Sequence, residues 1–91
     1  MLTNQYTKDP SAILDWAFDW TDWLAAAETI TDYIITADTG ITVDSSTEDD
    51  GKVTVWLSGG TAGINYKVAC LITTSAGRTD ERTIWIKVVD R

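Results

Sequence analysis

Residues 66–89, YKVACLITTSAGRTDERTIWIKVV, decide the fold class of this chain. In each half of the stretch every second residue is apolar: Tyr66, Val68, Cys70 and Ile72 before the connection at 75–78, and Ile84, Ile86 and Val88 after it. Side chains of a strand alternate with a period of two, and a short connection that contains glycine is typical of a hairpin. The stretch therefore predicts two antiparallel strands joined by a turn, in an all-β protein.

Four segments upstream have the same strand character: residues 14–20, 29–37, 41–43 and 52–58. In the first of them Leu14, Trp16, Phe18 and Trp20 alternate with carboxylates and an alanine. We expect these four apolar side chains to face the interior and the carboxylates to face solvent. The inward face of 29–37 is not assigned, because apolar residues occur on both sides of that strand.

The connections between these segments carry turn signals. Residues 19–28 allow one helical turn at most, because the segment is too short for an independent helix. Residues 45–51 predict a loop that ends on an Asp-Gly turn. The whole pattern predicts an immunoglobulin-like β-sandwich of six to seven antiparallel strands over residues 10–91. Residues 1–9 are polar and unpatterned, so we expect a flexible N-terminal arm that a partner orders.

Charge and composition exclude several functions. The chain has 91 residues, seven basic and fourteen acidic side chains, and a net charge of −7. Nucleic acids and anionic membranes are bound by clustered Lys and Arg, so we expect neither as a partner. Cys70 is the single cysteine, so the chain forms no internal disulfide, and a reducing site of synthesis is favoured. A membrane span and a signal-peptide pattern are both missing, so we expect synthesis in a cytoplasm.

Neither an enzyme nor a bound cofactor is expected. Histidine, the usual base in Ser or Cys nucleophile schemes, does not occur in the chain, and Cys70 has no evident activating group. One acidic segment could suit calcium, since hard cations bind clustered oxygens: Asp44, Glu48, Asp49 and Asp50. Its spacing departs from the EF-hand pattern, so a solvated acidic loop is the simpler interpretation, and calcium binding stays an alternative.

Two of the five tryptophans are candidates for a contact surface. Trp56 and Trp85 lie on the predicted outward faces of their strands, opposite apolar neighbours. They would either form exposed aromatic patches that bind a partner or be covered by the N-terminal arm. Tyr66, which follows Gly63, is placed like the tyrosine of a tyrosine corner, whose phenol bonds to the backbone upstream.

The order of several short motifs resembles the fiber-tail adaptor proteins of tailed bacteriophages. The motifs are Lys8-Asp9-Pro10, Leu14-Asp15-Trp16, Asp19-Trp20, Trp23-Leu24, residues 56–63, Tyr66, residues 74–78 and Arg82. The resemblance covers about residues 6 to 91. The chain departs from the pattern at two positions: Ala27 stands where a glycine is expected, and Trp16 stands where a tyrosine is expected.

The resemblance implies a small immunoglobulin-like structural protein of the virion tail, without enzymatic activity, that joins a receptor-binding fiber to the tail or baseplate. The implied partners are fiber and tail or baseplate proteins, and copies of the chain could form a symmetric homo-oligomer around the tail axis. The alternative is a carbohydrate-binding module that uses outward tryptophans for stacking. The residues expected to contact partners are Tyr6, Lys8, Asp9, Pro10, Trp56 and Trp85.

Overall fold

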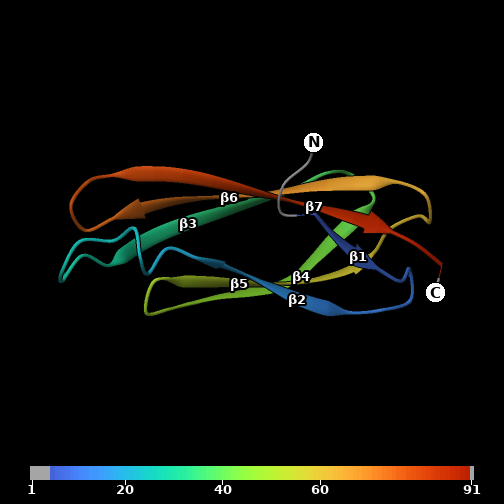
Figure 1. Cartoon of the computed structure of the whole chain (residues 1–91), viewed down its shortest axis with the longest axis horizontal. Helices are drawn as coiled ribbons and strands as arrows, with labels where there is room; N and C mark the ends of the chain where they lie inside the picture. The colour runs from blue at the N-terminus through green and yellow to red at the C-terminus, as the bar shows by residue number, and fades with distance from the viewer. Residues whose placement is uncertain (1–4, 91) are drawn as a thin grey trace.

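The structure is a computed structural model that describes residues 5–90. This range forms seven strands: β1 (Gln5–Lys8), β2 (Leu14–Asp19), β3 (Ile30–Ala37), β4 (Ile41–Asp49), β5 (Lys52–Gly59), β6 (Asn65–Thr74) and β7 (Thr79–Val88). They build a β-sandwich from a four-stranded sheet, in the order β1-β7-β6-β3, and a three-stranded sheet, in the order β2-β5-β4. Figure 1 shows the two layers, with β6 and β7 in the upper one and β2 and β5 in the lower one.

The strand order is that of an immunoglobulin domain, as the sequence predicts. In constant-type domains strands B, E and D share one sheet and strands C, F and G form the other. Here β2, β5 and β4 take the places of B, E and D, while β3, β6 and β7 take those of C, F and G. The pairs are antiparallel apart from β1, which runs parallel to β7. The expectation of antiparallel pairing throughout is therefore wrong for this pair.

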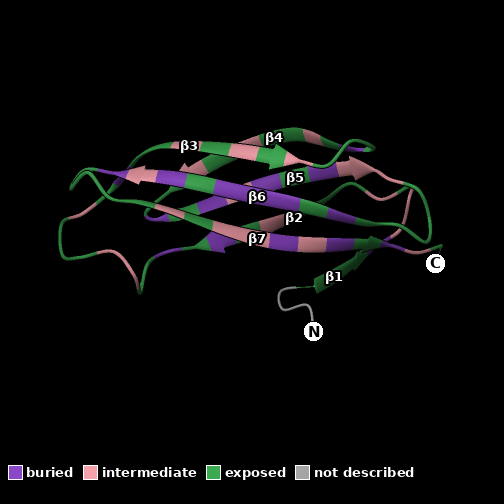
Figure 2. Cartoon of the chain, turned by 90° about the horizontal axis from the view of Figure 1, so that it is seen from above, coloured by how far each residue is buried: buried purple, intermediate pink, exposed green. Residues whose placement is uncertain are grey.

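The apolar core lies between the sheets and is made of their inward-facing residues. Figure 2 shows buried positions concentrated along β5, β6 and β7. Burying a Val, Leu or Ile side chain stabilises a fold by roughly 2 kcal/mol. The buried cluster consists of Phe18, Trp20, Ile30, Ile41, Val53, Val55, Leu57, Tyr66, Val68, Cys70, Ile72, Ile84, Ile86 and Val88. Both strands of the predicted hairpin contribute the face that their alternation indicates.

Strand β2 confirms its predicted inward face over the second half of the segment. Phe18 is 3 % exposed and Trp20 0 %, while both carboxylates of β2 face solvent. Trp16 is partly buried against the core. Leu14 remains exposed, because it opens the strand at one end of the sandwich. The connection after β2 contains turns and no helix.

A β-bulge explains why the inward face of β3 cannot be assigned from alternation alone. The register to β6 shifts between Ile30 and Asp32. An extra residue moves all later side chains to the opposite face of a sheet. Ile30, before the bulge, is buried. After the bulge Tyr33 and Ile35 pack on the core, whereas Ile34 is 56 % exposed.

Strand β4 differs from the expectation of a short strand followed by an acidic loop. It runs from Ile41 to Asp49 and pairs with β5 along this length, apart from a bulge between Val43 and Ser45. The predicted turn is confirmed but is confined to Asp50 and Gly51, whose φ values are 49° and 86°. Two consecutive positive φ values are typical of a type I′ hairpin turn. The polar residues of 44–49 therefore lie on a strand, and the loop interpretation is wrong.

Tyr66 confirms the predicted tyrosine corner. Its side chain is buried, and its hydroxyl oxygen accepts a hydrogen bond of 2.8 Å from the backbone amide of Thr61. Two glycines let the ring approach the backbone: a Cβ atom at Gly40 would lie 2.9 Å from the ring, and one at Gly60 would lie 3.3 Å from it. Tyr66 thereby fixes the loop between β5 and β6 against the turn between β3 and β4.

Part of the segment expected as a flexible arm is a strand of the four-stranded sheet. Gln5–Lys8 pairs with Trp85–Val88 of β7. The amide of Val89 donates to the carbonyl oxygen of Lys8, which extends this pairing. Residues 1–4 of the expected arm lie outside the described residues. Gln5–Lys8 contains one aromatic residue among three polar ones, so it has no apolar alternation that could have indicated this pairing.

Candidate docking surfaces

The two tryptophans expected to face outward lie on opposite sides of the molecule. Trp56 belongs to β5 of the three-stranded sheet and Trp85 to β7 of the four-stranded sheet. Trp56 is 40 % exposed between two fully buried neighbours, and Trp85 is partly exposed between Ile84 and Ile86. Each ring is therefore on the outer face of its own sheet. The two rings therefore do not belong to one aromatic platform.

Two acidic residues lie near Trp56 on its face of the sheet. Asp15 of β2 and Ser45 of β4 are the residues that pair with Trp56 across the sheet. The carboxylate of Asp44, in the bulge of β4, accepts a hydrogen bond of 2.9 Å from the hydroxyl of Ser58. We call this surface the acidic face and define it by Asp15, Asp44 and Trp56.

Two basic residues lie beside Trp85, and an exposed apolar pair lies further along the same sheet. Lys67 of β6 pairs with Trp85, and Lys87 lies two residues further along β7 on the same face. Across the same sheet Ile34 of β3 pairs with Leu71 of β6, and their exposed fractions are 56 % and 37 %. Sequence alternation could not predict that this pair is exposed, because the bulge in β3 determines which face of the sheet Ile34 is on. We call the part of this surface defined by Lys67, Trp85 and Lys87 the basic face.

The expected contact residues in and after β1 divide into buried and accessible ones. Tyr6 is 41 % exposed, and its ring centroid lies 6.2 Å from that of Trp16 in the other sheet. Lys8 is fully buried, and its Nζ atom donates to the carbonyl oxygens of Asp9 and Gly59, both at 2.8 Å. Burial lowers the pKa of Lys8, although nearby carboxylates partly oppose the effect. The Lys8 ammonium group is therefore not available to a partner.

Asp9 and Pro10 form a turn at one end of the sandwich. The carboxylate of Asp9 accepts from the amide of Ser11, and its carbonyl oxygen accepts from the amide of Ala12. Asp followed by Pro is a common start of a type I turn. Next to this turn is Ile13, which is 60 % exposed, and the β5–β6 loop at the same end exposes Ile64 at 46 %. Both isoleucines were missed from the sequence, because each stands outside an alternating segment.

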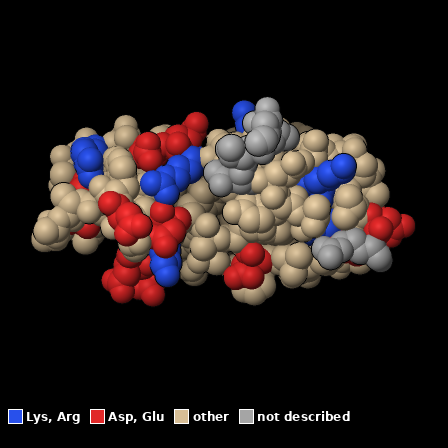
Figure 3. Space-filling view, in the orientation of Figure 1, with Lys and Arg blue, Asp and Glu red and all other residues tan. Residues whose placement is uncertain are grey.

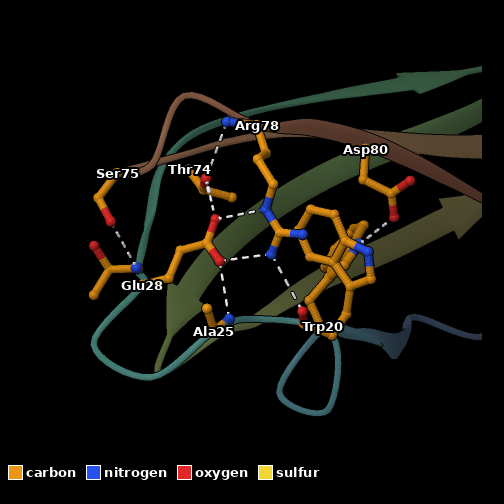
Figure 4. Close-up of polar contacts among 9 residues, drawn as sticks. Trp20, Ala25, Glu28, Thr74, Ser75, Arg78 and Asp80 are labelled. Atoms are coloured by element: carbon orange, nitrogen blue, oxygen red, sulfur yellow. Dashed lines mark hydrogen bonds and ion pairs between the residues drawn. The ribbon is translucent and has the colours of Figure 1, made fainter.

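A carboxylate–guanidinium pair closes the opposite end of the sandwich (Figure 4). Arg78, after the β6–β7 turn, donates to both oxygens of Glu28 at 2.6 and 3.0 Å. Glu28 also accepts from the hydroxyl of Thr74 and from the amide of Ala25, and only 3 % of its side chain is exposed. These donors lower the pKa of Glu28 to about 2, with the Arg78 hydrogen bonds as the largest cause. The pair ties the 20–29 connection to the β6–β7 hairpin.

Arginine side chains also pack on two tryptophans near this end. The guanidinium of Arg78 lies 3.9 Å from the ring centroid of Trp23, and that of Arg82 lies 4.9 Å from Trp20. The indole nitrogen of Trp20 donates to Asp80 at 2.8 Å. Such contacts combine apolar cover with cation–π attraction. All these groups have partners within the chain, so we interpret them as structural.

A groove with an acidic rim lies beside the Glu28–Arg78 pair. It passes between the connection after β2 and the β4–β5 turn, and its lining includes Leu24, Ala25, Ala26, Glu48, Asp49 and Asp50. Figure 3 shows carboxylates concentrated in the half of the visible surface that contains this end. A groove lined by both apolar residues and carboxylates suits a segment that carries apolar and basic side chains.

Among residues 5–90, no group of three carboxylate or cysteine side chains gathers as a metal site. Burial raises the pKa of the Cys70 thiol to about 12, so the group remains protonated and poorly nucleophilic at neutral pH. In the part of the chain that the structure describes, no helix could cross a membrane.

Comparison with known families gives a match over most of the chain. Residues 8–87, nearly the whole chain, match the family described as "Podophage GP4 fiber-tail adaptor protein gp77". The chain belongs to this family. No curated protein matches it. Membership makes the chain a structural adaptor of the phage tail, which confirms the resemblance found in the sequence and agrees with the sandwich fold.

Proposed function

We propose that this adaptor joins a fiber protein to a tail or baseplate protein through the two ends of its long axis, without catalysis. The molecule extends 43 Å along this axis. One end exposes Ile13 and Ile64 beside the Asp9-Pro10 turn, and the other end carries the acid-rimmed groove. The observation that carries the proposal is this difference between the ends, because an adaptor must bind two unlike partners.

The apolar end suits an apolar partner surface. Two isoleucines exposed at 60 % and 46 % lose their hydration when a partner covers them, which favours association. Tyr6 and Pro10 flank this end and stay proposed contact residues. The acidic end suits a partner with basic side chains, because electrostatic complementarity accelerates association and excludes acidic competitors.

Complementation of a phage that lacks this gene tests the proposal. One variant carries Ile13→Lys and Ile64→Lys, and the other carries Asp49→Lys and Asp50→Asn, since Asn tolerates the positive φ at that position. Particles are purified, and their adaptor and fiber contents are measured by mass spectrometry and electron microscopy. We expect one variant to give tails that keep the adaptor but lack fibers, and the other to give tails that lack both.

Conservative variants provide the control. Ile13→Val with Ile64→Val, and Asp49→Glu alone, preserve the character of each end and should give particles with normal fibers. Equal melting temperatures for all purified variants exclude a folding defect. Normal fiber content in both disruptive variants, or the same defect in both, would contradict the two-ended arrangement.

A further inference from the structure

We propose that the acidic face of one copy of this chain packs against the basic face of the next copy. The occupant of each face is therefore a second copy of the chain. The proposal deepens the proposed function, because side-by-side contacts through the sheet faces leave both ends of every copy free for fiber and tail partners.

The charge around Trp56 supports the first half of this contact. Asp15 lies directly beside Trp56 in the sheet, and Asp44 lies at the neighbouring bulge. Lys52, the basic residue on the same face, is placed between Asp19 and Asp49 in the sheet register. The surroundings of the exposed indole are therefore negative, and they favour a positively charged partner surface.

The remaining cations of the described chain supply the other half. Arg78 pairs with Glu28 and Arg82 with Asp80, while Lys8 is buried. Among residues 5–90, neither Lys67 nor Lys87 takes part in a salt bridge. Both flank Trp85 on the outer face of the four-stranded sheet. In a chain with a net charge of −7, this is where a carboxylate of another copy is attracted.

The placement of the two faces determines the symmetry of the contact. They lie on opposite sheets, so two copies that join through them each keep one unused face. Such a contact is heterologous, and repeating it gives a ring when the rotation closes and an open filament when it does not. Each junction brings the exposed Trp56 of one copy and the partly exposed Trp85 of the next towards a desolvated centre, where tryptophans contribute strongly to binding.

Analytical ultracentrifugation of the purified full chain tests this contact without any phage partner. We expect the sedimentation coefficient of the native chain to rise with protein concentration, and this rise to weaken at high salt. One variant, Asp15→Asn with Trp56→Ala, removes the acidic face, and the other, Lys67→Gln with Trp85→Ala, removes the basic face. Each alone should stay monomeric over concentrations at which the native chain associates, with a dissociation constant raised at least roughly 30-fold.

The mixture of the two variants gives the decisive result. Each retains the face that the other lacks, so together they should form a one-to-one dimer that does not grow further. Ala76→Ser, in the exposed β6–β7 turn, is the control and should associate like the native chain. A native chain that stays monomeric at low salt, a single variant that associates normally, or a mixture that stays monomeric would overturn the proposal. The complementation assay of the two ends would be unaffected by any of these results.

Discussion

The two ends of the sandwich each remove one charged group from solvent, and they do so in different ways. At the apolar end the Lys8 ammonium donates to two neutral carbonyl oxygens. At the grooved end the Glu28 carboxylate meets a guanidinium that donates to both of its oxygens. Both pKa values are lowered, yet the causes are opposite, because burial disfavours the Lys8 cation while hydrogen bonds favour the Glu28 anion. Burial therefore disfavours both ions, and at Glu28 the hydrogen bonds from Arg78 and its neighbours outweigh that cost.

The largest expected effect is at Lys8. Lys8→Ala removes a fully buried side chain and leaves two carbonyl oxygens without their donor. We expect the free energy of unfolding to fall by about 3 kcal/mol in urea titration. Lys8→Met keeps the packing and should lose about 1 kcal/mol. Equal losses in the two variants would show that the hydrogen bonds, and not the stem, dominate at this end.

A smaller effect on the stability of the fold is expected from the Glu28–Arg78 pair, and this effect depends on pH. The pKa of Glu28 is about 2 in the folded chain and 4.5 ordinarily, so between these values the unfolded chain binds more protons. Stability contributed by the Glu28 anion is therefore present above pH 4.5 and is lost as the pH falls towards 2.

Thermal melting of Glu28→Gln against the native chain measures this contribution. We expect the difference in melting temperature between the two to be largest near neutral pH and to shrink as the pH falls through this window. Arg78→Gln is the matched variant and should behave in the same way. A difference that does not change with pH would rule out the anion as its source.

The smallest effect concerns the backbone beside Glu28. Ala27 has a φ of 64°, in the left-handed region that costs an alanine about 1 kcal/mol. Ala27→Gly should therefore raise the free energy of unfolding by up to about 1 kcal/mol in the same titration, less the extra entropy that glycine loses on folding. Ala26→Gly, one residue earlier, is the control and should not stabilise the chain. The strain also gives a physical reason for the glycine that the resemblance leads one to expect at this position.

Much of the fold could be predicted because it depends on neighbouring residues. Alternation indicated the β6–β7 hairpin, and the Asp-Gly pair marked the β4–β5 turn. The docking surfaces were harder, since Lys8 was expected as a contact and is buried, whereas Ile34 becomes exposed only through a bulge. Bulges shift a face by one residue without any sequence signal as clear as alternation.

The sequence alone indicated the strands other than β1 and the second half of β4, the Asp-Gly turn, and the corner that Tyr66 anchors, because period and turn chemistry act within a few residues. Only the tertiary structure decided that β1 joins β7 in parallel, that Arg78 reaches Glu28 fifty residues away, and that Trp56 and Trp85 face opposite directions. These outcomes depend on pairing between distant strands, and hydrogen bonds between strands leave no local pattern in the residues that make them.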